Sequence, residues 1–269
     1  MYILAILFFY EGKNDLDKVK VSICVVTHNN EGEILNLVDS VLNNTKRVSF
    51  KMYIVDNNSS DNTIKCVKSK YGNLEIIRNV NNKGFGYAHN KVLNLIDSDY
   101  HIIINPDISF KTDVISDLCD YMDSNPFVSI VTPRVLSEDG SEQHLPKKEP
   151  KLKYLFAGKF EKFSKYFSNL RNEYTMKEKD LKEPTEIDFC TGCFMMIRTK
   201  LFKKLNGFDD RFFMYFEDAD LSRRARNYGR IIFNPQVSVT HLWDRASSKK
   251  LKFLFIHISS MVKYFRKWH

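Results

Sequence analysis

The 269-residue sequence has few of the residues that mark disulfide-rich, fibrous or disordered proteins: five cysteines, seven prolines and ten glycines. An odd number of cysteines, three of them inside apolar runs, predicts no disulfide framework, and we expect a reducing compartment. Because 43% of the residues are hydrophobic and 28% are charged, disorder, collagen and coiled coil are excluded too. The length predicts one large globular domain or two small ones.

A long hydrophobic run is also missing. Residues 1–10 are apolar, whereas a helix that spans a bilayer needs about 20 such residues. No positive charge precedes this run and a charged stretch follows it, which is not the pattern of a signal peptide. We therefore interpret residues 1–20 as an N-terminal extension, either an extra strand or a loose anchor, and expect a cytoplasmic protein.

The formal net charge of +8 is unevenly distributed. Residues 147–183 carry +5 and residues 249–269 carry +6, which leaves the remaining chain slightly acidic. Two basic patches on an acidic body predict an anionic partner, either nucleic acid or phospholipid. Nucleic acid is the weaker hypothesis, because none of the usual nucleic-acid-binding motifs is present.

The first half of the chain alternates short β-branched runs with amphipathic helical patterns. Such a series predicts an α/β fold with a mainly parallel central sheet flanked by helices, which binds ligands beyond the carboxyl ends of its strands. The predicted strands are 21–27, 52–56, 74–78, 101–105 and 128–135, and the predicted helices are 34–42, 63–70, 88–96 and 114–122.

The pattern breaks at residues 136–184, which we interpret as a mobile or helical insertion. It resumes with an apolar run at 187–197, helices at 199–205 and 218–227, and strands at 230–233 and 237–240. Residues 249–269 interleave apolar residues with six cations. They predict a basic amphipathic helix, which either lies on an anionic membrane or packs on the core.

Polar residues follow three of the predicted strands, beginning at Thr27, at Asp56 and at Asn105. Asn, Asp and Ser also end strands as turn formers and helix caps, so each cluster alone is weak evidence. Their repetition at successive strand ends indicates a ligand site. Gly84 and Gly86, in a turn before a helix, permit a ligand to approach the backbone closely, but their spacing is not that of a dinucleotide-binding motif.

Three carboxylates, Glu217, Asp218 and Asp220, follow an aromatic run at the start of a predicted helix. Crowded carboxylates beside aromatic surface resist ionising together, so one should have the raised pKa that a general base near neutrality requires. The alternative is a solvated helix start, stabilised by the helix dipole.

His241 follows the last predicted strand. It is either a structural residue or, with Asp107, a ligand to a divalent cation that also binds phosphates. Cys190 and Cys193 form one C-x-x-C pair without a second, which predicts small core residues and no zinc site.

Six motifs, in one order, resemble the inverting family 2 glycosyltransferases of the GT-A fold, and among them the rhamnosyltransferase-like branch of bacterial surface-polysaccharide assembly. The resemblance covers residues 21–243 and implies a nucleotide-sugar-binding half, Rossmann-like, at 21–135 and an acceptor-binding and catalytic half at 136–248. The motifs are 22–29, 55–61, 82–90, 105–107, 191–192 with 207–209, and 216–220.

The resemblance also implies roles for single residues. Asp218 would be the catalytic base, and Asp107 and His241 would hold Mg²⁺ or Mn²⁺ at the diphosphate. Asn105-Pro106-Asp107 takes the place of the family's D-x-D motif, with an amide for one carboxylate. Donor binding is assigned to Thr27, Asn29, Asp56, Asn58, Lys83, Gly84, Asn90, Asn105 and Asp107, and the acceptor site to Gly192, Glu217 and Asp220.

The implied reaction moves a sugar from a nucleoside diphosphate to a glycan acceptor on a lipid diphosphate, in O-antigen, capsule or related polysaccharide assembly. It would take place at the inner face of the cytoplasmic membrane, with the enzyme bound peripherally. The first expected donor is dTDP-L-rhamnose, and the alternative is a UDP-hexose or UDP-N-acetylhexosamine. The sequence leaves a homodimer open.

Overall fold

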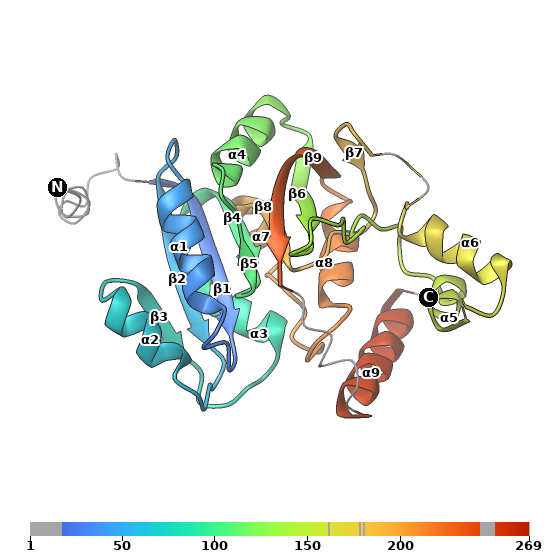
Figure 1. Cartoon of the computed structure of the whole chain (residues 1–269), viewed down its shortest axis with the longest axis horizontal. Helices are drawn as coiled ribbons and strands as arrows, with labels where there is room; N and C mark the ends of the chain where they lie inside the picture. The colour runs from blue at the N-terminus through green and yellow to red at the C-terminus, as the bar shows by residue number, and fades with distance from the viewer. Residues whose placement is uncertain (1–17, 161, 178, 180, 243–250, 269) are drawn as a thin grey trace.

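The computed structural model describes residues 18–160, 162–177, 179, 181–242 and 251–268 (Figure 1). Most of the predicted N-terminal extension lies outside the described residues. The first half contains β1 (Val19–Thr27), α1 (Ile34–Asn44), β2 (Phe50–Asp56), α2 (Thr63–Lys70), β3 (Glu75–Arg78), α3 (Phe85–His89), the 3-10 turn η2 (Asn90–Val92), β4 (Ser98–Ile104), β5 (Ile108–Ser109), α4 (Val114–Ser124) and β6 (Val128–Leu136). The second half contains α5 (Leu152–Phe160), α6 (Lys165–Tyr174), β7 (Thr185–Glu186), β8 (Phe194–Arg198), α7 (Thr199–Lys204), α8 (Glu217–Ala225), β9 (Arg230–His241) and α9 (Leu251–Trp268).

The described strands form one nine-stranded sheet in the order β3-β2-β1-β4-β8-β6-β9-β5, with β7 paired to β9. Strands β1 to β4, β6 and β9 run in one direction, while β5, β7 and β8 run in the other. The prediction of an α/β fold with a mainly parallel sheet is therefore confirmed. Because β8 is reversed between β4 and β6, its first residues lie at the edge where its neighbours end.

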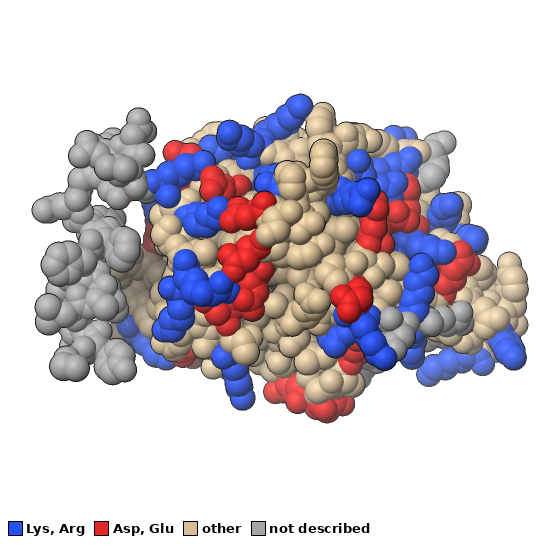
Figure 2. All heavy atoms as spheres, turned by 90° about the horizontal axis from the view of Figure 1, so that it is seen from above, with Lys and Arg blue, Asp and Glu red and all other residues tan. Residues whose placement is uncertain are grey.

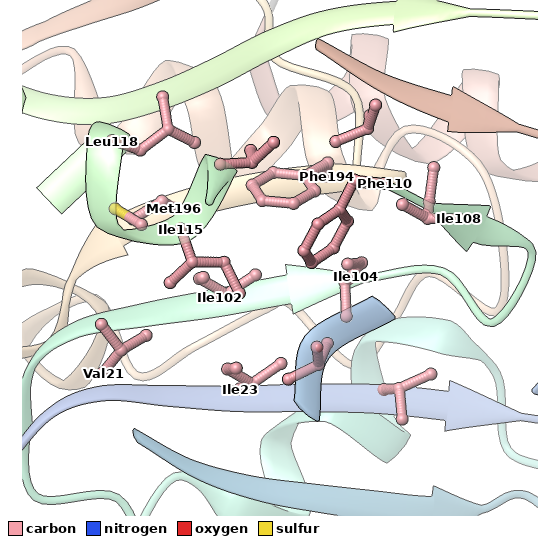
Figure 3. Close-up of a cluster of buried hydrophobic side chains, with 14 of the residues drawn as sticks. Val21, Ile23, Ile102, Ile104, Ile108, Phe110, Ile115, Leu118, Phe194 and Met196 are labelled. Atoms are coloured by element: carbon pink, nitrogen blue, oxygen red, sulfur yellow. The ribbon is translucent and has the colours of Figure 1, made fainter. Parts of the chain in front are cut away.

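Two hydrophobic layers cover the faces of the sheet. On one face, α1, α2 and α4 pack on the strands, and on the other face α3, α7 and α8 do so. The β-branched runs bury side chains on both faces, as strands covered on both sides require. Figure 3 shows part of the first layer, from β1, β4, β5, α4 and β8, with Val21, Ile23, Ile102, Ile104, Ile108, Phe110, Ile115, Leu118, Phe194 and Met196 labelled.

Two predicted elements differ in the structure. The helix predicted at 88–96 is only the short α3 followed by η2, because the Asn90 side chain bonds to the backbone of Phe208 in the second half of the chain. The two strands predicted at 230–233 and 237–240 are one strand, β9. Its pairing with β6 shifts register between Pro133 and Arg134, so an irregularity replaces the expected break.

The 136–184 insertion is helical in its second part, where α5 and α6 pack on each other through the stacked rings of Tyr154 and Tyr174. Helix α9 packs on the core: Tyr264 is fully buried beside Phe216, and Ser260 Oγ donates to the Met214 carbonyl at 2.8 Å. Figure 1 shows α5, α6 and α9 at the end of the molecule opposite α2 and β3. One face of α9 therefore packs on the core, as one of the two alternatives predicts.

Figure 2 shows acidic and basic side chains side by side on the face seen from above. Among the ion pairs of the protein, Arg47 pairs with Asp113, Asp117 and Asp120 on α4 or at its start. Charges paired in this way do not form the continuous basic stripe that a nucleic-acid backbone needs. The arrangement on this face gives no support to the nucleic-acid hypothesis.

Candidate active site

The polar strand ends predicted from the sequence lie along one edge of the sheet. Thr27 pairs in register with Asp56, at the ends of β1 and β2. After β4, the Asn105 N–H donates to the Cys193 carbonyl at 2.9 Å, just before β8 begins. This edge is where α/β sheets bind their ligands.

Asp107 and His241 are brought together by the pairing of β5 with β9. Asp107 Oδ2 lies 3.2 Å from His241 Nε2. Asp107 Oδ1 is buried and accepts no hydrogen bond from the described part of the chain. One open carboxylate oxygen beside one imidazole nitrogen is a donor set that fits a divalent cation.

Gln143, in the insertion, was missed by the sequence reasoning. Its amide oxygen lies 3.0 Å from His241 Nδ1, and its amide nitrogen donates to the His241 carbonyl at 3.0 Å. Because an amide oxygen only accepts, this contact places a ring proton on Nδ1. Nε2 is thereby directed at the Asp107 carboxylate, so that a bound cation could lie between the imidazole and the carboxylate.

Asp218 lies in the first turn of α8 and is partly exposed. Its Oδ2 accepts the Gly192 N–H at 3.1 Å, and its Oδ1 accepts the Ala219 N–H at 2.9 Å. Burial raises the pKa of Asp218, whereas the Gly192 N–H and the charge of Lys147 act in the opposite direction. A raised pKa suits a general base that works near neutrality.

Glycine at position 192 lets the backbone pack closely against the Phe85 ring beside Asp218. A Cβ there would lie 3.1 Å from the Phe85 ring and 3.7 Å from Asp218 Cβ. The three residues 191–193 thus hold two parts of the site, since the Cys193 carbonyl binds Asn105 and the Gly192 amide binds Asp218. Cys190 and Cys193 are buried free cysteines, which confirms the prediction of core residues.

Glu217 is only 5% exposed, and its Oε2 has no hydrogen-bond partner among the described residues. Burial, and then the charge of Asp218, raise the pKa of Glu217 well above its ordinary value. Of the two neighbours, Asp218 is better placed to carry the negative charge, because its oxygens accept two backbone N–H groups whereas Glu217 Oε2 accepts none from the described residues. The sequence predicted one raised pKa in this cluster, whereas in the structure the pKa values of both Glu217 and Asp218 are raised.

The backbone before α8 is strained. Tyr215 and Phe216 have φ angles of 70° and 68°, in the left-handed region that non-glycine residues rarely adopt. Each such residue costs about 1–3 kcal/mol, and residues of this kind collect at functional sites. Their effect here is to turn the chain sharply into the carboxylate-bearing first turn of α8.

The structure gives Asp220 a different role from the predicted acceptor contact. Its side chain is fully buried, with Oδ2 2.8 Å from Arg224 Nε. Oδ1 lies 2.7 Å from Lys267 Nζ and accepts the Trp268 Nε1–H at 2.8 Å. Asp220 therefore anchors α9 to α8, and its fully buried carboxylate has no exposed surface for an acceptor.

Asn90 and Gly84 also join the two halves of the chain. Asn90 donates to the Phe208 carbonyl and accepts the Phe208 N–H, at 2.8 and 2.9 Å. Gly84 has a φ of 102°, and the Phe85 N–H next to it donates to the Phe213 carbonyl at 2.9 Å. These contacts within the protein account for both residues. They give no support to the predicted contact of Asn90 with the nucleotide sugar.

The other predicted donor residues surround the ends of β1 and β2. Asp56 is buried; one of its oxygens accepts the Ser59 N–H, and the other lies 3.0 Å from Arg78 Nε. For a nucleotide to contact Asp56, the exposed Arg78 side chain would have to move. Asn29 bonds to the Ser60 N–H and braces the loop after β2. Thr27 is buried, whereas Asn58 and Lys83 are exposed.

These features define an α/β fold with carboxylates gathered along one edge of its sheet. The model of the family described as glycosyl transferase family 2 matches residues 22–206, more than two thirds of the chain. The chain therefore belongs to glycosyl transferase family 2. A second model, described as the N-terminal domain of galactosyltransferase, matches residues 172–245.

Characterised relatives are similar at modest identity. The chain is 27% identical over 232 residues to the rhamnosyltransferase WbbL of Escherichia coli. This match covers 82% of this chain and 83% of WbbL. The chain is 26% identical over 203 residues to the N-acetylglucosaminyl-diphospho-decaprenol L-rhamnosyltransferase of Mycobacterium tuberculosis, covering 70% of this chain. The match spans only 65% of the mycobacterial protein.

Two solved structures share the fold. GalNAc-T7, crystallised with UDP, GalNAc and Mn²⁺, superposes with a TM-score of 0.61 at 16% identity, over 85% of this chain and 45% of its own. Residues 1–349 of S. aureus TarS superpose with a TM-score of 0.58 at 18% identity, over 83% of this chain and 60% of their own. These likenesses confirm the prediction of the GT-A glycosyltransferase fold.

Proposed function

We propose that this protein is an inverting glycosyltransferase that moves L-rhamnose from dTDP-L-rhamnose to a glycan acceptor on a lipid diphosphate. The observation that carries the proposal is the bracing of Asn105 and Asp218 by the same segment, residues 191–193. It sets a general base beside the strand end at which a diphosphate would bind. The names of the bacterial relatives support the sugar and the acceptor class.

In this mechanism Asp218 takes the proton from an acceptor hydroxyl as its oxygen attacks the anomeric carbon. The attack comes from the side opposite the nucleoside diphosphate, so the configuration is inverted. The Gly192 N–H holds one oxygen of Asp218 in place. Protonated Glu217 adds no second negative charge beside the base, which leaves Asp218 as the group that accepts the proton.

Asp107 and His241 would hold a divalent cation, Mg²⁺ or Mn²⁺, with Gln143 orienting the imidazole. When bound, the cation neutralises charge on the departing diphosphate. Within the described ranges, no three His, Cys, Asp or Glu residues gather as a metal cage. Diphosphate oxygens and water would complete the coordination, as is usual for Mg²⁺ in nucleotide-dependent enzymes.

Helix α9 is the element that we expect to bind the membrane surface. No helix among the described residues is long and apolar enough to span a bilayer. An exposed apolar stripe nevertheless runs along α9 on the face opposite buried Tyr264, with Lys and Arg residues beside it. The stripe consists of Leu251, Leu254, Phe255, Ile258 and Val262. Apolar residues flanked by cations suit the inner, anionic face of a cytoplasmic membrane.

A thermal-shift screen of nucleotide sugars, with and without Mg²⁺ or Mn²⁺, tests the donor. A ligand that binds only the folded protein raises the melting temperature, by an amount that grows with its affinity. The proposal expects the largest shift with dTDP-L-rhamnose and metal. A larger shift with a UDP-hexose or UDP-N-acetylhexosamine would support the alternative donor, and no shift with any nucleotide sugar would refute the function.

Vesicle flotation tests the membrane surface. Phe255→Ser should reduce binding of the protein to vesicles that contain phosphatidylglycerol. Phe127→Ser is the matched control, because Phe127 is also a strongly exposed phenylalanine, 81% against 68% for Phe255, but lies just before β6 and not on α9. Equal flotation of the two variants would contradict a membrane role for α9.

A further inference from the structure

Lys147 is a cation in the 136–184 insertion to which the reaction described above gives no task. Its carbonyl accepts the backbone N–H groups of Asp188 and Phe189, both at 3.1 Å. Its Nζ lies 5.0 Å from the centroid of the Phe189 ring. Gly192, which binds Asp218, follows three residues later. The Lys147 backbone is therefore fixed to the segment that holds the proposed base.

The neighbouring lysine differs from Lys147 in its surroundings. Lys148 Nζ lies 3.0 Å from Glu173 Oε1, and its backbone N–H donates to the Tyr174 carbonyl. Its charge is thus already paired. Lys147 is half-buried, and no carboxylate in the described ranges lies at ion-pair distance from its Nζ. A partly buried cation without a paired anion is unfavourable unless a ligand supplies the negative charge.

Charge also connects Lys147 with the proposed base. Burial lowers the pKa of Lys147, and the charge of Asp218 raises it. The pKa of the Cys193 thiol responds both to Lys147 and to Asp107, after the larger effect of its burial. The segment to which the Lys147 backbone is bonded continues into Gly192, which binds Asp218, and into Cys193, whose carbonyl binds Asn105 at the strand end where the donor diphosphate would lie.

We propose that Lys147 is a donor-binding residue whose ammonium group contacts the diphosphate of the nucleotide sugar. This assignment rests on the proposed function. In the transfer step, the bond from the anomeric carbon to the diphosphate oxygen breaks and its electron pair stays on that oxygen. The acceptor oxygen bonds to the anomeric carbon and its proton goes to Asp218. Lys147 stabilises the charge left on the nucleoside diphosphate through a charge-assisted hydrogen bond.

Isothermal titration of dTDP and dTMP, in the presence of Mg²⁺, tests the contact. UDP and UMP replace them if the donor screen selects a UDP sugar. Lys147→Met should weaken binding of the diphosphate at least about tenfold, the effect of losing a hydrogen bond to a charged group, and should weaken binding of the monophosphate less than about twofold. Lys147→Arg should restore most of the diphosphate affinity, and the control Lys148→Met should bind both nucleotides like the wild-type protein.

Other results of these titrations would contradict either the assignment of Lys147 or the proposed function. Unchanged diphosphate affinity in Lys147→Met would overturn the assignment, and so would an equal loss for diphosphate and monophosphate, which indicates a structural role. A higher KM for the lipid-linked acceptor alone would move Lys147 to the acceptor. Wild-type protein that binds neither nucleotide would refute the proposed function itself, whatever the variants do.

Discussion

Replacing Gly84 by alanine tests how the two halves of the site are joined. A Cβ at this position would lie 2.0 Å from the Phe213 carbonyl oxygen and 2.7 Å from its carbon. The φ of 102° and ψ of 174° also lie in a region that is essentially reserved for glycine. The strain costs about 1–3 kcal/mol, and loss of the hydrogen bond from Phe85 to Phe213 adds about 1 kcal/mol. We therefore expect a loss of about 2–4 kcal/mol in the free energy of unfolding.

Urea denaturation followed by circular dichroism measures this change. Gly72→Ala is the matched control, because a Cβ at Gly72 meets nothing within 4 Å. Its free energy of unfolding should equal that of the wild type or exceed it slightly, since alanine restricts the unfolded chain. If Gly84→Ala is as stable as Gly72→Ala, the close approach of Gly84 to Phe213 is not present in solution.

Three further predictions concern single side chains. Gln143→Leu removes both hydrogen bonds to His241 and should raise the Mn²⁺ concentration needed for half-maximal transfer about 10–100-fold. An unchanged metal titration would contradict this role of Gln143. Burial lowers the pKa of His101 to about 3, so the folded state excludes a proton that the unfolded chain binds below about pH 6.5. Stability is lost as the pH falls, and His101→Gln should remove about 2 kcal/mol of the loss between pH 7 and pH 5, whereas parallel pH–stability curves would refute it. Asp220→Asn removes the buried carboxylate that pairs with Arg224 and, beside Asp209, with Lys267. It should cost about 3 kcal/mol of stability with an unchanged acceptor KM, while a higher KM without a loss of stability would restore the predicted acceptor role.

The sequence predicted the first half of the fold well because its strands are covered on both faces. Continuous β-branched runs such as Val21–Thr27 then have no competing interpretation as amphipathic helices. The direction of β8 could not be predicted, since the run at 187–197 carries no sign of which neighbours it pairs with. The short α3 was also missed, because its end depends on contacts of Asn90 with a segment more than 100 residues away.

The candidate site was predicted where residues follow strand ends. Asp107 and His241 do so, and the structure brings them together. Gln143 and Lys147 lie in an insertion without periodicity, and their partners are distant in sequence. Asp220 was grouped with Asp218 because the two are only two residues apart in the sequence. Residues two apart on a helix point about 200° away from each other, so Asp220 faces α9 instead of the site.

The paired variants Asp218→Asn and Glu217→Gln test the central claim most directly, with donor binding and sugar transfer measured on the same samples. We predict that Asp218→Asn binds the donor nucleotide like the wild type and transfers sugar about 10²–10⁴-fold more slowly. Glu217→Gln mimics the protonated acid and should keep turnover within about tenfold of the wild type. Turnover near the wild-type rate in Asp218→Asn would contradict the assignment of the base.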